Sequence, residues 1–257
     1  MLTALSPSGA LIVSVDTSRE AGPFRCPGCE GPVVYRSGSH VMAHFAHKAG
    51  TAPDYCDRVA ESLEHERIKL AIFEAAREAG ITFAQPEYKI PGHIIDVALI
   101  GKAHKVAVEV QISPMKLEDI KARVAGHAAA GFKTLWVIKP PEAEEGPDEK
   151  YRNPAFQRDI HELGLGALFV HRSGLLFDVI HLMGYAHVTM FFMKQSFRPL
   201  HLFDLDFTSA SVVVPKAADR WWERLTRWER AETPAITNPQ NSYEESLLRP
   251  GPLVTKT

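Results

Sequence analysis

The sequence has few cysteines, almost no net charge and no long apolar run, and each shortage argues against a class of protein. Three cysteines in 257 residues, an odd number, do not suggest a framework of disulfide bonds. The formal net charge is −2, so no overall basic excess marks a nucleic-acid binder, although a local basic patch would suffice. No run of about 18 apolar residues is available to cross a membrane. The first residues also lack the basic start and cleavage site of a signal peptide, so we expect a cytoplasmic protein without a membrane partner.

The composition that is present is that of an ordinary globular protein. Hydrophobic residues make up 45% of the chain and charged residues 23%, which fits a fold with a buried core. Shifts in composition and a Pro-rich, polar stretch at 140–150 suggest where the chain divides. We expect an N-terminal domain with all the cysteines at 1–58, a core domain at 59–140, a C-terminal domain at 151–232 and a disordered tail at 233–257.

Two apolar stretches in the middle of the chain, 94–100 and 106–112, each carry an acidic residue. Both are rich in β-branched residues and therefore predict neighbouring strands. Because side chains alternate between the faces of a strand, Glu109 and Gln111 should share one face, and Asp96 should point away from its apolar neighbours. A carboxylate in an apolar strand is costly unless it is paired or binds a cation. Asp96 and Glu109 therefore predict a Mg²⁺ or Mn²⁺ site.

The surrounding pattern predicts the order helix, three strands, helix, strand, which is a mixed α/β domain. Residues 59–79 are amphipathic and are followed by Gly80, a residue suited to the end of a helix. Ser113 and Pro114 suit the N-cap and first position of a second helix, which would run to about Ala130. The strands are expected at 82–90, 93–100, 104–112 and 133–139.

Both predicted helices carry polar residues that could serve the same site. Glu61 and His65 extend the apolar stripe of the first helix towards its N-terminus, where they would face the metal. The alternative is that Glu61 only interacts with the helix dipole and His65 is a satisfied edge residue. Lys116, Arg123 and His127 share one flank of the second helix, and they could meet phosphates or form an ordinary solvated surface.

The N-terminal segment contains a pattern typical of metal ligands. Cys26 and Cys29 form a Cys-x-x-Cys motif, His44 and His47 begin after fourteen intervening residues, and Cys56 follows after eight more. Two thiolates so close can reach one ion without long-range folding, which resembles a zinc site. Only two residues separate the histidines, fewer than usual, so Cys56 could replace one of them. We expect one structural zinc, because four protein ligands leave no position for a catalytic water.

The last hundred residues carry no motif of clear chemical meaning. Apolar runs within 151–215 predict a further small set of strands. Trp221, Leu225 and Trp228 are spaced as on one face of a helix over 220–232. We interpret this helix as a docking element, and the alternative is an aromatic surface that stacks on single-stranded bases.

Taken in order, these motifs resemble a known family. The order of helices and strands, with the two acidic strands, is similar to the PD-(D/E)XK nuclease superfamily. Over residues 20–140 the combination resembles more specifically the competence protein CoiA family. The motifs that carry this resemblance are Cys26-x-x-Cys29, His44-Phe45-Ala46-His47, Glu61-Ser62-x-Glu64-His65-x-x-x-Lys69, Asp96-Val97, Glu109-Val110-Gln111-x-Ser113 and Gly131-x-x-x-x-Trp136-Val137-Ile138. The resemblance implies a PD-(D/E)XK-like αβββαβ core with an N-terminal zinc-binding domain and a C-terminal α/β extension.

The resemblance also implies roles for individual residues. Asp96 and Glu109 would ligate Mg²⁺ or Mn²⁺, and Glu61 or His65 would complete the catalytic site. Gln111 stands where the superfamily usually has a lysine, and a glutamine carries no charge and cannot act as a base. The basic residues that could supply the missing charge or contact DNA are Lys69, Lys116 and Arg123.

The function implied by the resemblance is a metal-dependent DNA nuclease that acts in natural transformation. Its partner would be DNA, single-stranded or in recombination intermediates, together with recombination proteins. Because of Gln111, a second reading is a DNA-binding or recombination-accessory protein that has a degenerate nuclease fold and does not cleave. A third reading is a structural zinc protein whose carboxylates form salt bridges.

Overall fold

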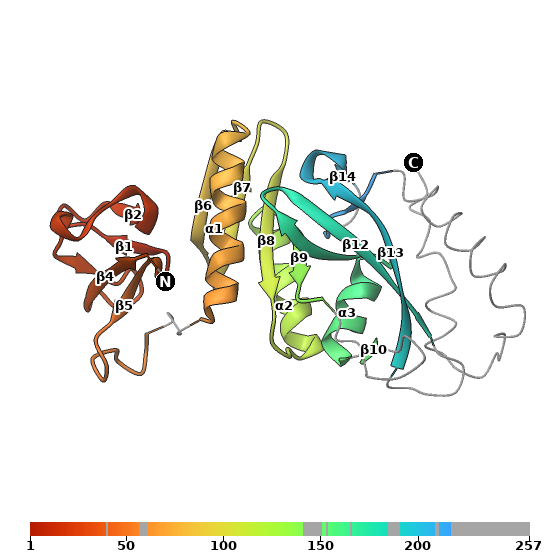
Figure 1. The fold of residues 1–257 in the computed structure, drawn as a ribbon, viewed down its shortest axis with the longest axis horizontal. Helices are drawn as coiled ribbons and strands as arrows, with labels where there is room; N and C mark the ends of the chain where they lie inside the picture. The colour runs from red at the N-terminus through yellow and green to blue at the C-terminus, as the bar shows by residue number, and fades with distance from the viewer. Residues whose placement is uncertain are drawn as a thin grey trace, which may run out of the picture.

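The computed structural model describes residues 1–39, 41–56, 61–140, 151–152, 154–164, 166–184, 191–208 and 211–216. The predicted helix at 220–232, the predicted tail at 233–257 and nearly all of the predicted linker at 140–150 lie outside these residues. The described chain forms a small N-terminal sheet beside a large mixed sheet with helices on both faces (Figure 1). No helix within the described residues is long and apolar enough to span a membrane.

The N-terminal domain is a five-stranded antiparallel sheet with the order β2-β1-β3-β4-β5. Its strands are β1 (Thr3–Leu5), β2 (Leu11–Val13), β3 (Phe24–Arg25), β4 (Pro32–Gly38) and β5 (Val41–His47). In its core the rings of Phe24 and Phe45 meet edge to face, with centroids 5.1 Å apart, and Cys26 is buried beside them. A core this small is typical of domains that a metal stabilises.

The central part of the chain has the predicted order of helix, three strands, helix and strand, which confirms the mixed α/β fold class. The elements are α1 (Leu63–Glu78), β6 (Phe83–Ile90), β7 (His93–Ile100), β8 (Lys105–Gln111), α2 (Leu117–Ala129) and β9 (Lys133–Ile138). β6, β7 and β8 pair antiparallel, whereas β8 and β9 pair parallel because α2 carries the chain back across the sheet.

Both helices begin later than predicted, and a local N-cap explains where α1 begins. Ser62 is its N-cap, since the hydroxyl oxygen accepts a hydrogen bond from the His65 amide at 3.2 Å. Gly80 lies just after α1 with a φ of 71°, the left-handed conformation in which a glycine commonly ends a helix, as predicted. The predicted cap at Ser113 is wrong, because α2 starts at Leu117 and the Lys116 carbonyl accepts the first helical hydrogen bonds.

The C-terminal segment continues the same large sheet. Its elements are β10 (Tyr151–Arg152), α3 (Ala155–Leu163), β11 (Leu168–Ser173), β12 (Leu176–Gly184) and β13 (Phe191–His201), followed by the pair β14 (Leu205–Asp206) and β15 (Val214–Pro215). β11 pairs parallel with β9, so the eight strands run in the order β10-β13-β12-β11-β9-β8-β7-β6. Strands are therefore present within 151–215 as predicted: β10 to β13 extend the core sheet, and β14 and β15 form a separate two-stranded sheet.

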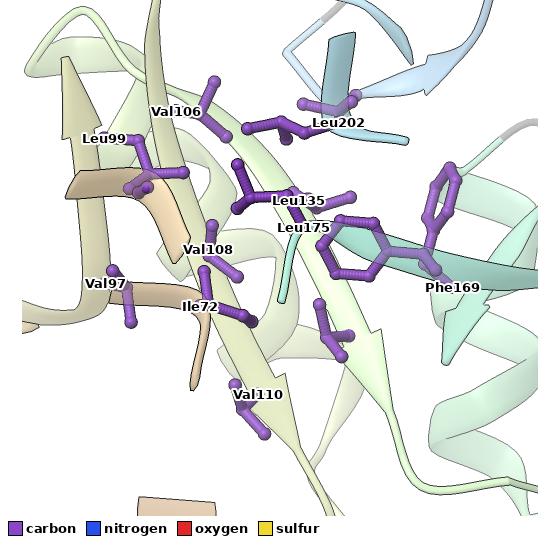
Figure 2. Close-up of a cluster of buried hydrophobic side chains, with 14 of the residues drawn as sticks. Ile72, Val97, Leu99, Val106, Val108, Val110, Leu135, Phe169, Leu175 and Leu202 are labelled. Atoms are coloured by element: carbon purple, nitrogen blue, oxygen red, sulfur yellow. The ribbon is translucent and has the colours of Figure 1, made fainter. Parts of the chain in front are cut away.

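The two faces of the large sheet are covered by different helices. Ile72 of α1 packs in the larger cluster with Val108 and Val110 of β8 (Figure 2). Ile120 of α2 packs on the other face in a cluster with Trp136 of β9 and residues of α3. The alternation along β8 therefore directs its valines towards α1 and the residues between them towards α2.

Candidate functional site

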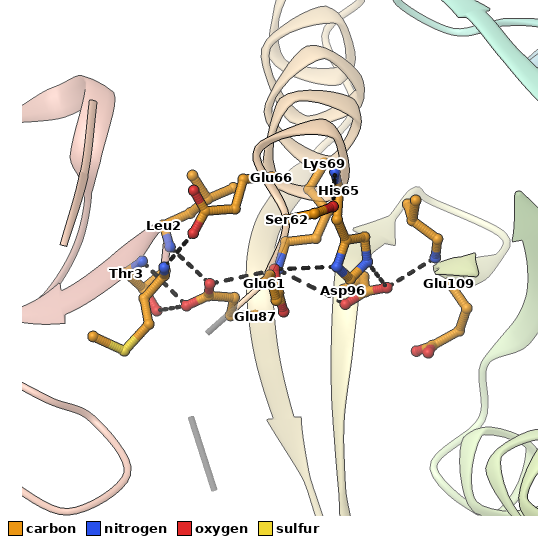
Figure 3. A network of polar contacts seen from close by, with 12 residues as sticks. Leu2, Thr3, Glu61, Ser62, His65, Glu66, Lys69, Glu87, Asp96 and Glu109 are labelled. Carbon is orange, nitrogen blue, oxygen red and sulfur yellow. Dashed lines mark hydrogen bonds and ion pairs between the residues drawn. The ribbon is translucent and has the colours of Figure 1, made fainter. Parts of the chain in front are cut away.

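The N-terminal end of α1 and the middle of β7 bring three predicted site residues together. The imidazole of His65 lies between two carboxylates, with Nδ1 3.3 Å from Glu61 Oε2 and Nε2 3.0 Å from Asp96 Oδ2 (Figure 3). One donor atom from each of these residues lies within 4.8 Å of the other two. Such a compact set of two carboxylates and one imidazole can hold a divalent cation.

Lys69, one helical turn beyond His65, completes the cluster. Its Nζ atom lies 2.5 Å from Glu61 Oε2, 3.5 Å from Glu87 Oε1 and 3.8 Å from Asp96 Oδ1. The side chain is fully buried, so the prediction that Lys69 contacts DNA directly is wrong. The lysine lies instead among the carboxylates of Glu61, Glu87 and Asp96.

Asp96 reaches α1 because the strand alternation is interrupted there. In a regular strand, residues three apart such as Ile95 and Ala98 would point to opposite faces. Here both pack on the face away from α1, whereas Val97 packs on the α1 face. The pairing of β7 with β8 ends at Val97, and beyond it the Val110 amide donates to Asp96 Oδ2 at 2.8 Å. The prediction that Asp96 points away from its apolar neighbour Val97 is therefore wrong, because it assumed an unbroken pleat.

The charges of the cluster shift one another's pKa values. Burial disfavours a charged His65, but the hydrogen bonds to Asp96 and Glu61 outweigh it and raise the pKa of His65 to about 9. Burial would raise the pKa of Asp96, yet the hydrogen bond from His65 and the charge of Lys69 hold that pKa below its usual value. The same balance lowers the pKa of Glu61 and raises that of Lys69. At neutral pH all four groups are charged.

Glu109 occupies a different environment from Asp96. It is 1% exposed and faces α2, where Oε2 accepts from Arg123 and Oε1 lies 3.3 Å from His127 Nε2. The prediction that Asp96 and Glu109 hold one cation is thus not matched by the described geometry, because the two carboxylates have separate partners. His127 is fully buried and bonded through Nδ1 to Thr134 at 3.0 Å, so it does not belong to an exposed basic flank.

The remaining predicted residues of this site lie near α2. Gln111 is 8% exposed and donates to the Ser113 carbonyl. Lys116 is exposed at the start of α2, and the Arg123 side chain is 33% exposed beside Glu109. Lys116 therefore remains available at the surface, whereas Arg123 is paired with Glu109 and Gln111 is committed to a local contact.

The N-terminal domain forms a second cluster from Cys26, Cys29, His47 and Cys56. The Sγ atoms of Cys26 and Cys56 are 3.7 Å apart, and His47 Nε2 lies 3.7 Å from Cys29 Sγ and 3.6 Å from Cys56 Sγ. A tetrahedral zinc, with bonds of about 2.3 Å to sulfur and about 2.0 Å to nitrogen, separates its ligands by about 3.5–3.8 Å. The four side chains therefore fit such an ion.

His44 lies outside this cluster. His44 and His47 are three residues apart on β5 and so point to opposite faces of the strand. The Nδ1 atom of His44 is instead 2.8 Å from the Met42 carbonyl. Of the two choices that the sequence left open, the structure selects His47 with Cys56.

The backbone around Cys26 has the form of a tight metal-binding loop. The Gly28 amide donates to the Cys26 sulfur at 3.3 Å, and the Cys26 amide donates to the Gly31 carbonyl at 2.8 Å. A Cβ atom at Gly31 would lie 3.3 Å from Cys29 Sγ, so this position favours glycine. Burial raises the pKa of the Cys26 thiol to about 11 in the metal-free protein, and a bound cation would have to displace that proton.

Sequence reasoning missed one residue of the first site, Glu87. It lies 4% exposed in β6 and contacts Lys69. Its signal was available, because Glu87 is also an acidic residue within a predicted strand, like Asp96. Its φ of 53°, which turns the side chain towards α1, is not readable from the sequence.

The fold and the two clusters define a nuclease-like α/β domain joined to a small cysteine- and histidine-containing domain. Residues 11–55 match the family model for the competence protein CoiA, N-terminal domain, and residues 61–170 match that for the competence protein CoiA, nuclease-like domain. The matches together cover more than half of the chain, which therefore belongs to the competence protein CoiA family. No curated protein and no solved structure matches the chain.

Proposed function

We propose that this protein is a divalent-metal-dependent deoxyribonuclease that processes DNA during natural transformation. The observation that carries the proposal is the group of Glu61, His65 and Asp96 beside the buried ammonium of Lys69. This group lies in the region that matches the nuclease-like domain of the family.

The donor set suits Mg²⁺ or, better, Mn²⁺. Carboxylate oxygens are the hard ligands that both ions take, and an imidazole is more acceptable to Mn²⁺ than to Mg²⁺. Asp96 and Glu61 would hold the ion, with His65 as a third ligand after losing its proton. A cation there would supply an activated water and stabilise the leaving oxygen of the phosphodiester.

Lys69 supplies the positive charge that Gln111 cannot. Its ammonium lies 3.8 Å from Asp96, whereas the Gln111 side chain is bonded to the Ser113 carbonyl near α2. A buried, fixed cation offsets developing negative charge more effectively than a solvated one, because it needs no reorganisation. Lys116 lies exposed at the surface, and we assign it to the DNA backbone. Arg123 is paired with Glu109, so it would reach a phosphate only by leaving that carboxylate.

We also propose that the cluster of Cys26, Cys29, His47 and Cys56 holds a structural zinc. Four protein ligands close the coordination sphere, so the ion would stabilise the small N-terminal core rather than perform chemistry. DNA and recombination proteins remain the partners that we propose for the assembled protein.

Cleavage of labelled single- and double-stranded DNA with Mg²⁺ or Mn²⁺ tests the proposed activity. Asp96→Asn should reduce cleavage by at least about 100-fold. The matched control is Asp16→Asn. Asp16 is an exposed acidic residue outside the site, with Oδ1 2.8 Å from the Arg77 guanidinium, and its variant should cleave like the wild type. Wild-type protein that never cleaves, or Asp96→Asn that cleaves normally, contradicts the proposal.

A second function is favoured by the charge balance of the site. His65 and Lys69 already pair with the carboxylates of Glu61 and Asp96, and Arg123 pairs with Glu109, so each of these carboxylates has a cationic partner without a catalytic metal. This arrangement would suit a DNA-binding protein that does not cleave. In a filter-binding assay, the wild type and Asp96→Asn would then bind DNA with the same affinity. Neither protein would give cleavage products with any divalent metal.

A further inference from the structure

We propose that Glu87 is a positioning residue, which fixes the ammonium of Lys69 in the candidate site and is itself held by Thr3 of the N-terminal domain. The inference rests on the proposed function, because it assigns the small domain a part in arranging that site. It makes β1 a structural component of the nuclease-like domain.

The contacts of Glu87 run in two directions. On one side the Leu2 amide donates to Oε1 at 2.7 Å, and Thr3 donates to Oε2 from its amide at 3.2 Å and from its hydroxyl at 2.6 Å. On the other side Oε1 accepts from Lys69 Nζ at 3.5 Å. Figure 3 shows this line of contacts from β1 through Glu87 to the end of α1. The carboxylate thus joins the N-terminal sheet to the candidate site.

The backbone of β6 is shaped to present this carboxylate. Glu87 has a φ of 53°, a left-handed conformation that residues other than glycine seldom adopt. It lies opposite Asp96, because Pro86 pairs with Val97 and Tyr88 with Ile95. The two irregular positions therefore face each other on neighbouring strands, and both direct a carboxylate to Lys69.

The role of Glu87 follows from what a cation would do to the other partners of Lys69. Glu61 and Asp96 belong to the group that would hold the ion, and their charge would then be shared with it. Glu87 is 4% exposed and lies outside that group. It can therefore hold the ammonium in place when the other two carboxylates turn to the metal.

The packing around β1 supports a fixed rather than a loose connection. Leu2 is fully buried in the main hydrophobic cluster, together with Ile72 and Phe73 of α1. Thr3 is likewise fully buried. The peptide groups that bind Glu87 are thus held by the core of the nuclease-like domain itself.

The test compares Glu87→Gln, Thr3→Val and the control Asp16→Asn in the full chain. Glu87→Gln removes the charge that holds Lys69 and keeps one of the two oxygens that accept from β1, while its NH2 group faces a β1 donor. Thr3→Val keeps the shape but loses the hydroxyl. Asp16→Asn weakens another contact between the two domains, the exposed pair of Asp16 and Arg77, without touching Lys69.

Two readouts separate positioning from general stability. The first is the ¹⁵N–¹H signal of the Lys69 ammonium, assigned by its loss in Lys69→Arg. The second is the split between kcat and KM for DNA cleavage with saturating Mn²⁺. We expect Glu87→Gln to shift or broaden the signal and to lower kcat about tenfold or more with KM within about threefold. Thr3→Val should act in the same direction and less strongly, and Asp16→Asn should change neither readout.

A failure of this inference can be told apart from a failure of the proposed nuclease activity. If wild type does not cleave, the nuclease proposal fails, and the Lys69 signal alone decides the positioning role. If Glu87→Gln folds and leaves both the signal and kcat unchanged, Glu87 does not position Lys69. If Glu87→Gln does not fold, the Thr3→Val variant tests the positioning role instead. An unchanged Lys69 signal in Thr3→Val then overturns the inference.

Discussion

The Nζ atom of Lys69 lies 3.8 Å from the Oδ1 atom of Asp96, and both side chains are withdrawn from solvent. Three carboxylates, those of Glu61, Glu87 and Asp96, surround this ammonium, and His65 supplies the second positive charge. Five charged groups in so small a volume are tolerable only because each has an opposite partner. The site is therefore a network whose members depend on one another.

Replacing Lys69 with methionine should destabilise the protein and abolish cleavage. The substitution keeps the length of the side chain but leaves buried carboxylates without their cation, which costs about 3–5 kcal/mol. Urea denaturation monitored by circular dichroism measures the loss. The control is Lys102→Met in the exposed turn between β7 and β8, which should stay within about 0.5 kcal/mol of wild type. Equal stability of the two variants would show that the network contributes little.

The stability of the metal-free protein should fall as the pH rises through about 9. The folded pKa of His65 is raised from 6.5 to about 9, so its charged form stabilises the fold fully below pH 6.5 and progressively less up to pH 9. The contribution that is lost is about 3 kcal/mol, because each unit of pKa difference corresponds to about 1.4 kcal/mol and the side chain is largely buried.

Comparison with His65→Gln isolates this effect from other alkaline transitions. The difference in the free energy of unfolding between wild type and variant should be largest at pH 6 and should shrink by pH 9.5. A difference that is constant over this range would mean that His65 does not carry the charge.

Much of the fold was readable because its elements have strong local patterns. The apolar stripe of α1 and the β-branched runs of β7 and β8 indicated their types directly. The order of helix, three strands, helix and strand followed from these patterns, whereas the parallel pairing of β8 with β9 was not predicted. The extension of the same sheet by β11, β12 and β13 was not readable, since nothing local to a strand says which sheet it joins.

The candidate site was only partly predictable, because it depends on departures from regular structure. Helical spacing placed Glu61 and His65 together, and in the structure both lie beside Asp96. Strict alternation misplaced Asp96, because the interruption beside Val97 is a property of the paired strands. His44 was a candidate ligand because the strand β5, which separates it from His47, was not predicted.

Substitution of the two histidines should give opposite results for zinc. His47→Ala removes a ligand and should weaken zinc binding by about 100-fold or more, whereas His44→Ala should retain one zinc per chain. Elemental analysis after equal exposure to a chelator measures the retained metal. His44→Ala is the matched control, since both residues lie on β5. Loss of zinc in both variants, or in neither, would contradict the ligand set of the structure.

Glu109 and Arg123 should show a measurable coupling in stability. Arg123→Met leaves the buried Glu109 carboxylate without its strongest donor and should cost about 2–3 kcal/mol. Adding Glu109→Gln to Arg123→Met removes the unpaired charge. It should restore about 1–2 kcal/mol of the free energy of unfolding that Arg123→Met loses. Chemical denaturation of the four proteins completes the cycle. Additive effects would show that the ion pair does not hold Glu109 at α2.

Restoring a lysine at position 111 should not restore or increase cleavage. Gln111 pairs with Ile138 in the sheet, and Ile138 packs in the cluster formed with α2 and α3. A lysine at 111 would therefore extend towards α2, while the ammonium beside Asp96 is already supplied by Lys69. We expect Gln111→Lys to cleave within about twofold of wild type and to lose about 1–2 kcal/mol of stability, because it buries part of a new charge. Combined with Lys69→Met, it should leave the protein inactive. Rescue of Lys69→Met by Gln111→Lys would show instead that residue 111 reaches the site, and that the two lysine positions are interchangeable.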